Sequence, residues 1–284
     1  MLNNHFAASC TPTFFTPLRK LVASLSITLL LLIPQYPAFA DVTTVIREVG
    51  GYMVGPGADL TGADLTGLDL SNLDMSNANL QDAILYGANI SGTNLSGANL
   101  KGVSSGGLIG ITSSIPEGWR LANGYLLGQE ADLHGADLAN LDLTGLNLSG
   151  ANLYQADLTS SNLTNTNFTG SDLRANLKNS NLQGATLTGS KLGLIQASNL
   201  TGIKSGSIIG NAVVGSISGW SLINGYLVGP GADLNGAELG DANLSSANLT
   251  NVSSGNISGN PRLPTGWTLR RGYLIGNFAN LSGA

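Results

Sequence analysis

The sequence has few of the residues that enzymes use for chemistry. It contains one cysteine, two histidines and only 10% charged residues among 284. Ordinary globular domains carry about a quarter of their residues as charged side chains, so this composition argues against a catalytic domain. Disorder is disfavoured too, because disordered chains combine low hydrophobicity with high net charge, whereas this chain is 42% hydrophobic with a net charge of −5. Leu (47), Gly (39) and Asn (29) instead make up 115 residues, which is typical of a repeat protein.

The first forty residues have the pattern of a secretory signal peptide. Two basic residues precede an apolar run over residues 21–33, and Ala38-Phe39-Ala40 follows as an A-x-A cleavage signal. The run has thirteen residues, which is too short for a membrane span of about 20. We therefore expect cleavage near Ala40 and export to a periplasmic, lumenal or extracellular compartment, with no membrane anchor after cleavage.

Cleavage would leave 17 acidic and 10 basic residues, because two of the 12 basic residues precede the site, and the net charge would be −7. No cysteine would remain, which excludes disulfides, thiol nucleophiles and cysteine-ligated metals. The remaining histidine, His134, directly follows a repeated leucine, so we expect it to point to solvent. We predict no catalytic, metal-binding or cofactor-binding residues, and no enzyme activity.

An apolar residue returns at every fifth position in three tracts. The tracts cover residues 60–100, 133–192 with a one-residue loss after Leu173, and 234–249, with an isolated return at Leu200. A period of five fits neither an amphipathic helix nor a strand. The unit reads A-(D/N)-L-x-x, which suits a short extended segment followed by a corner. We expect the central Leu and the Ala two residues earlier to point inward, and the Asp or Asn between them to point outward.

These tracts resemble the pentapeptide-repeat family, in motifs such as Ala58-Asp59-Leu60-Thr61-Gly62. The resemblance implies a right-handed, four-sided β-helix with four pentads per coil. We therefore expect an all-β fold: a quadrilateral β-helical solenoid interrupted by short β-hairpin modules.

The modules are expected from a second pattern, G-W-x-L-x-x-G-Y-L, which begins at Gly118, Gly219 and Gly266. In the first two copies Asn-Gly precedes the Tyr, and this dipeptide is the strongest short signal for a two-residue hairpin turn. A half-motif at residues 51–55 precedes the first tract. Upstream of it, Val42, Val45, Ile46 and Val49 share one helical face, which predicts a short helical cap.

The aromatic residues of the modules are the candidate binding residues. They are Trp119, Tyr125, Trp220, Tyr226, Trp267 and Tyr273. Two interpretations stay open: the rings pack over the neighbouring coil, or they form an exposed docking stripe for a protein or a carbohydrate, since Trp and Tyr dominate interface hot spots.

The sequence thus divides into nine segments. They are a signal peptide (1–40), an N-terminal cap and half-module (41–57), a first repeat tract (58–102), a Trp/Tyr module (103–130), a second tract (131–202), a second module (203–231), a third tract (232–251), a third module (252–278) and the start of a further repeat (279–284).

We expect an exported structural or protein-interaction protein whose partner the sequence does not identify. One alternative is ice or polysaccharide binding through Ser and Thr faces that include Thr144 and Thr164. The family resemblance adds a second alternative, an acidic mimic of DNA that inhibits a topoisomerase, which export disfavours, so we expect no nucleic-acid partner. The last repeat leaves the Leu core open, so we expect either that the chain is a piece of a longer array or, as the resemblance implies, that it forms a homodimer through the C-terminal coil.

Overall fold

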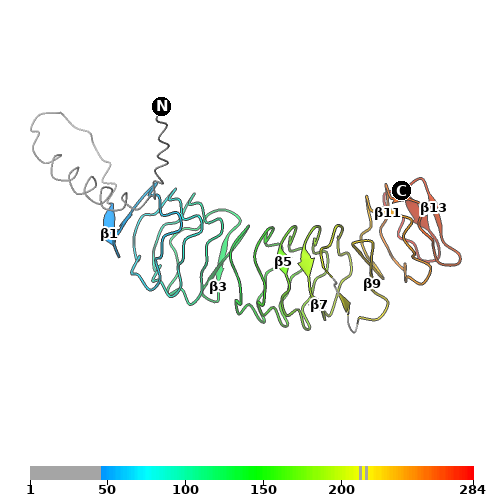
Figure 1. Cartoon of the computed structure of the whole chain (residues 1–284), viewed down its shortest axis with the longest axis horizontal. Helices are drawn as coiled ribbons and strands as arrows, with labels where there is room; N and C mark the ends of the chain where they lie inside the picture. The colour runs from blue at the N-terminus through cyan, green and yellow to red at the C-terminus, as the bar shows by residue number, and fades with distance from the viewer. Residues whose placement is uncertain (1–45, 211–212, 215–216) are drawn as a thin grey trace, which may run out of the picture. The chain divides into compact units, whose positions relative to one another are not determined.

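The computed structural model describes residues 46–210, 213–214 and 217–284 (Figure 1). Within these ranges every regular element is a β-strand or a single β-bridge, and there is no helix. None of these residues forms an apolar helix long enough to cross a bilayer. The expected signal peptide, Val42 and Val45 lie outside the described residues.

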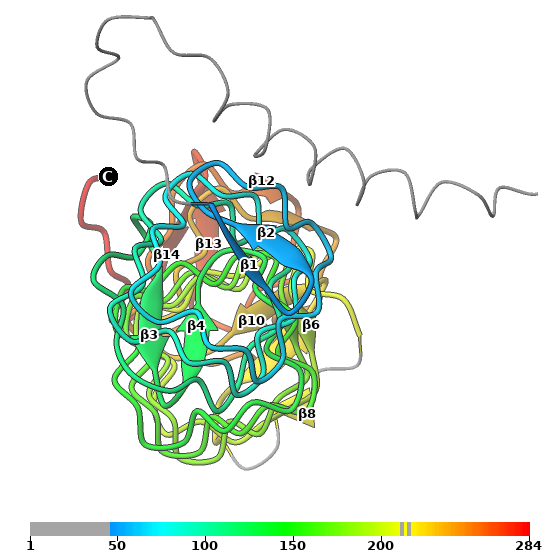
Figure 2. The same cartoon turned by 90° about the vertical axis from the view of Figure 1, so that its left-hand side faces the viewer.

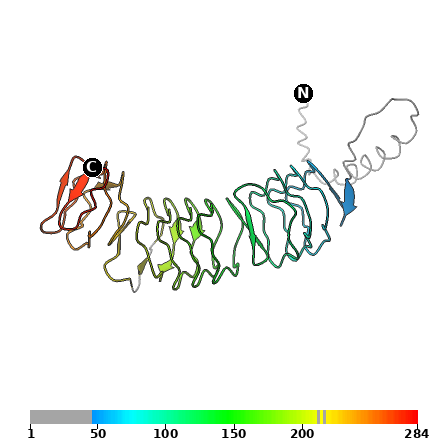
Figure 3. The same ribbon diagram turned by 180° about the vertical axis from the view of Figure 1, so that it is seen from behind.

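Parallel bridges stack the pentads into coils. Asp59 pairs with Asn79, and Asn79 pairs with Asn99, so the register advances by twenty residues at each step. One coil therefore contains four pentads of five residues. The coils follow one another in chain order (Figure 3), and a view along the stack shows them one behind another (Figure 2). This arrangement confirms the predicted all-β class and β-helix.

Each corner depends on a residue in the left-handed backbone region. Gly62 has a φ of 63° and Asn72 a φ of 57°. At the first of these corners the amide of Ala63 donates a hydrogen bond of 3.0 Å to the carbonyl of Leu60. Gly adopts this conformation without strain, and Asn tolerates it better than other residues. The position two after the central Leu is therefore mostly Gly or Asn.

The central leucines fill the interior of the coils in three clusters of buried residues. These clusters extend from Val54 to Leu126, from Leu127 to Leu227, and from Val228 to Leu274. The boundary between clusters falls between two consecutive residues of one strand. Such a strand therefore contributes one side chain to the tract before it and the next side chain to the tract after it.

The two boundary strands each belong to an antiparallel pair, and the described residues form four such pairs. The pairs are β1 (Arg47–Val49) with β2 (Tyr52–Val54), β3 (Arg120–Ala122) with β4 (Tyr125–Leu127), β9 (Ser221–Ile223) with β10 (Tyr226–Val228), and β13 (Thr268–Arg270) with β14 (Tyr273–Ile275). The turn between β3 and β4 has φ values of 46° at Asn123 and 75° at Gly124. Two positive φ angles are the requirement of a type I′ turn, which explains the Asn-Gly dipeptide.

The remaining strands are short and parallel. The pairs are β5 (Asp172–Leu173) with β6 (Lys191–Leu192), β7 (Leu194–Ile195) with β8 (Val213–Val214), and β11 (Glu238–Gly240) with β12 (Ser258–Gly259). The coils shorten in this region: Asp157 pairs with Asn176, 19 residues later, and Thr186 pairs with Lys204, 18 residues later. The one-residue loss after Leu173 accounts for the first shortening.

The expected helical cap is wrong for the part that the structure describes. Arg47–Val49 is strand β1, which pairs with β2 so that Val49 lies opposite Tyr52. Gly50 and Gly51 form the turn, with φ values of 59° and 87°. The spacing of the apolar residues suited a helix, but the glycine pair permits a two-residue hairpin turn, and the ladder then satisfies the backbone groups of both segments.

Candidate functional site

The outward Asp and Asn side chains form hydrogen-bonded ladders along the stack. Oδ1 of Asp142 accepts bonds from the amide and the hydroxyl of Thr144, at 3.1 and 2.6 Å. The hydroxyl bond is the main reason that the pKa of Asp142 lies below its ordinary value. Between coils, Nδ2 of Asn99 donates to Oδ1 of Asn79 at 2.8 Å. The outward polar side chains are therefore held in place both within a corner and from one coil to the next.

The threonine hydroxyls of the predicted Ser/Thr faces take part in these ladders. Oγ1 of Thr164 donates to Oδ1 of Asn162 at 2.6 Å, and Oγ1 of Thr169 donates to Asn167 in the same way. Nδ2 of Asn181 in turn donates to Oγ1 of Thr164 at 3.0 Å. Each of these hydroxyl groups uses its one hydrogen within the ladder, so an external ligand would have to donate a hydrogen bond to the hydroxyl oxygen.

The three module tryptophans are half-buried and pack on glycine backbone. The indole of Trp119 lies against Gly128 so closely that a Cβ there would overlap the ring, and Trp220 on Gly229 and Trp267 on Gly276 repeat the contact. Trp119 also contacts the first and second core clusters. The rings thus cover the junction between a module and its neighbouring coils.

The module tyrosines use their hydroxyl groups to attach each hairpin to the tract that follows it. The hydroxyl oxygen of Tyr226 accepts a bond of 2.9 Å from the amide of Glu238, twelve residues later, and Tyr125 accepts one of 3.3 Å from the amide of Asp137. Tyr273 instead donates to the carbonyl of Gly283 at 3.2 Å. The six candidate aromatics therefore all have contacts within the solenoid, and their partly exposed edges are the surface that a partner could reach.

A second aromatic site lies on the second tract. His134 is exposed, as its position after Leu133 predicted, and its ring centroid is 5.6 Å from that of Tyr154. The guanidinium carbon of Arg174 lies 4.5 Å from the centroid of Tyr154. Sequence reasoning missed Tyr154 and Arg174, although positions 134, 154 and 174 differ by one full coil of twenty residues and so share one column.

Asp172 holds Arg174 in this stack. Nε of Arg174 donates to Oδ1 of Asp172 at 2.8 Å, and Nη2 donates to the other carboxylate oxygen. The bond from Arg174 is the main reason that the pKa of Asp172 is lowered, and it raises the pKa of Arg174. Nζ of Lys191 lies 3.8 Å from the same carboxylate.

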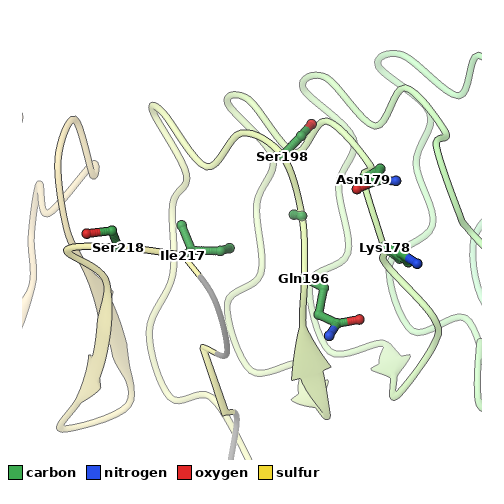
Figure 4. Close-up of a pocket in the computed structure, with 7 residues that line it drawn as sticks. Lys178, Asn179, Gln196, Ser198, Ile217 and Ser218 are labelled. Atoms are coloured by element: carbon green, nitrogen blue, oxygen red, sulfur yellow. The ribbon is translucent and has the colours of Figure 1, made fainter.

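A shallow, open pocket of about 440 Å³ lies beside the shortened coils. It is lined by Lys178, Asn179, Gln196, Ala197, Ser198, Ile217 and Ser218. Figure 4 shows these side chains on two neighbouring coils and on the segment that leads into β9. The lining is mostly amide and hydroxyl groups with one ammonium group. Within the described ranges, no three His, Cys, Asp or Glu residues are grouped so that they could hold a metal ion.

Comparison with known proteins identifies the repeats. The family model for pentapeptide repeats matches eight copies, over residues 56–82, 63–102, 136–174, 173–193 and 231–253. No curated protein shows significant sequence similarity to the chain.

Solved structures with local similarity include three pentapeptide repeat proteins. Rfr23 from the cyanobacterium Cyanothece 51142 is 23% identical over 52% of this chain and 63% of its own, with a TM-score of 0.18. A protein of the Arabidopsis thaliana thylakoid lumen is 26% identical over 46% of this chain and 63% of its own, with a TM-score of 0.17. HetL from Nostoc sp. strain PCC 7120 is 24% identical over 76% of this chain and 88% of its own, with a TM-score of 0.18. The chain thus spans less than two thirds of the first two proteins.

Proposed function

Because this chain belongs to the pentapeptide-repeat family, we propose that it is an exported, non-enzymatic protein whose β-helix presents a rigid surface to a protein partner. We also infer that its coils are right-handed and four-sided, as in other members of the family. The hairpin modules would then serve as joints between successive repeat tracts.

The hydrogen-bonded ladders are the observation that carries this proposal. An interface loses free energy when it orders flexible side chains, at a cost of about 0.5–1.5 kcal/mol for each one. In this protein the bonds within corners, such as Thr144 to Asp142, and between coils, such as Asn99 to Asn79, order the outward polar side chains before any partner arrives. Such a surface binds a partner with little further loss of entropy.

The same ladders weaken the alternative of ice or polysaccharide binding. A ligand that needs hydrogen-bond donors would find few on the Ser and Thr faces, because Thr144 and Thr164 donate their hydroxyl hydrogens to Asp142 and Asn162. The DNA-mimic alternative needs a continuous acidic surface. Residues 173–232 contain four basic residues and no acidic one, so the acidic character does not extend along the whole solenoid.

Cross-linking in the exported compartment tests the proposal. A photoreactive amino acid would replace Thr66, Thr144, Gln183 or Ser245, one position at a time, and mass spectrometry would identify cross-linked products. We expect one protein partner, captured reproducibly from a subset of these positions. The proposal would be contradicted if none of the four positions forms a cross-link to a protein. It would also be contradicted if the chain is cleaved near Ala40 but is not exported.

The module aromatics need a separate experiment, because packing and docking predict different results. Trp119→Ala and Trp220→Ala would be compared for stability and for capture of the cross-linked partner. If the indoles pack the joints, unfolding becomes easier by about 2–4 kcal/mol while the folded protein still captures its partner. If they form a docking stripe, capture is lost and stability changes less.

A further inference from the structure

One column of the second tract departs from the small polar residues used elsewhere on the surface. Bridges and the β5–β6 pairing place Asn152, Asp172, Lys191 and Ile209 side by side on consecutive coils. Tyr154 and Arg174 are two residues after the first two members of this column. Labels β5 and β7 mark the region in Figure 1.

Exposed apolar side chains lie in and beside this column where the coils shorten: Ile209 is its last member, and Leu194 is three residues after Lys191, in strand β7. Ile209 is 55% exposed and Leu194 is 48% exposed, next to Gly193, whose backbone lies against Arg174. The regular repeat has Asp or Asn at the corresponding outward positions. Tyr and Arg are enriched at interface hot spots, and the exposed side chains of Leu194 and Ile209 add apolar area beside them.

The aromatic part of this surface is already rigid. His134 comes from the coil before Tyr154 and Arg174 from the coil after it. The guanidinium of Arg174 lies over the phenol ring, and the imidazole of His134 lies beside it with its plane tilted by 37°. A sugar or a nucleic-acid base stacks on a free ring face, and the guanidinium of Arg174 already occupies one face of the Tyr154 ring. This geometry favours a polypeptide as the occupant over a glycan or a nucleic acid.

The charge of the surface indicates which side chains that polypeptide should carry. Arg174 and Lys191 both lie near one carboxylate, Asp172, which leaves one positive charge in excess. No acidic residue follows Asp172 before Asp233. A carboxylate of a partner therefore meets net positive charge here, and an adjoining apolar side chain can contact Leu194 and Ile209.

We propose that this surface is the docking patch for a protein partner, through an extended segment that carries an Asp or Glu next to a large apolar residue. The docking patch is defined by Tyr154, Arg174, Lys191, Leu194 and Ile209. The inference rests on the proposed interaction function and names the part of the solenoid that performs it.

Selection from a displayed library of random twelve-residue peptides tests the docking patch. The full chain would be the bait, and selected peptides would be titrated against a patch variant, Tyr154→Ser with Arg174→Ser and Leu194→Ser. A matched control, Thr164→Ser with Gln183→Ser and Thr201→Ser, alters outward positions on another face of the neighbouring coils. Circular dichroism melts would establish that both variants are folded.

The expected result is enrichment of peptides with an acidic residue beside an apolar one, which bind the patch variant at least tenfold more weakly and bind the control like the unaltered chain. Lys191→Glu should weaken the same peptides. Enrichment of basic peptides, no enrichment, or binding that the patch variant retains would overturn the docking patch. The docking patch would also be overturned if the chain binds polygalacturonate but no peptide, and the patch variant loses that binding. A cross-linked protein partner mapped to another face would overturn the docking patch and leave the proposed function intact.

Discussion

The repeat coils and the hairpin modules bury apolar side chains in different ways. In a coil, the central Leu of each pentad points inward and packs on equivalent leucines one coil before and after. In a module, consecutive residues point to opposite sides, so that Leu126 belongs to the first core cluster and Leu127 to the second. Coil positions therefore repeat one another, whereas a module residue has contacts specific to its junction, as Trp119 has with Gly128 and with both clusters. Substitutions in the two regions should therefore differ in how far neighbouring residues can compensate for the stability that is lost.

The largest effect is expected from a charge placed inside a coil. Leu153 is fully buried in the second cluster. Leu153→Asp leaves a carboxylate among leucines without a partner, which should lower the free energy of unfolding by about 4 kcal/mol or more. Because each coil is stabilised by its neighbours, the damage should spread through the second tract. Urea unfolding measures the effect, and unchanged stability would mean that the assignment of inward positions is wrong.

The next effect sharpens the contrast between modules and coils. Gly128→Ala introduces a methyl group where the Trp119 ring already lies, and overpacking of this kind costs about 1–3 kcal/mol. Trp119→Ala should remove most of that cost, so the two changes should be strongly non-additive in thermal melts. Gly62→Ala is the matched control in a coil. The new Cβ meets no atom within 4 Å, but the residue must keep a φ of 63°, which is strained for alanine. This strain should lower the stability by the same amount whether or not Trp119 is present. Additivity in both pairs would contradict the packing role of the indole.

The sequence was sufficient for the regular parts of the fold because they depend on residue types at a fixed spacing. Inward Leu153 followed from the five-residue period, and the β3–β4 turn followed from Asn123-Gly124. Strand β1 was missed because the Val spacing outweighed Gly50-Gly51, and only pairing with β2 reveals the turn.

The irregular region and the docking patch were harder to predict for a physical reason. When the coils shorten to 18 residues, the interior position passes to Ile195, and local sequence does not show which side chain turns inward. Tyr154 and Arg174 lie one coil apart, and their contact depends on the exact register of stacking. The recognition of the pentapeptide-repeat family itself is confirmed, since it needs only the repeat.

A smaller, stabilising effect is expected in the last module. Arg271 occupies the turn position taken by Asn123 and Asn224 in the other modules, and its φ is 49°. Side chains other than Asn, Asp and Gly are disfavoured in this region, so Arg271→Asn should raise the free energy of unfolding by about 0.5–1 kcal/mol. The reverse change, Asn123→Arg, should destabilise by more, because it also removes a bond of 2.9 Å from Nδ2 to the carbonyl of Asp137. A thermal melt in which Arg271→Asn lowers the midpoint would contradict this account of the turn.

The smallest effect concerns an outward position of a coil, next to Leu158. Oδ1 of Asp157 accepts bonds from the hydroxyl and amide of Thr159, and the hydroxyl bond is the main reason that the pKa of Asp157 lies below its ordinary value of 3.8. Asp157→Asn retains an acceptor oxygen at this position, so stability at pH 7 should change by less than about 0.5 kcal/mol.

The Asp157→Asn variant and the original chain should differ in how their stability depends on pH in acid. A carboxyl group whose pKa is lower in the folded state contributes stability above its unfolded pKa, and this contribution is lost as the pH falls through the folded pKa. Below about pH 4 the original chain should therefore lose stability at Asp157 as well as at other lowered carboxyl groups such as Asp74 and Asp142. The Asp157→Asn variant lacks one of these groups, so its unfolding free energy should fall less steeply between pH 4 and pH 2. Urea titrations at several pH values measure the two slopes, and equal slopes would mean that the Thr159 bond does not stabilise the ionised carboxylate in the folded protein.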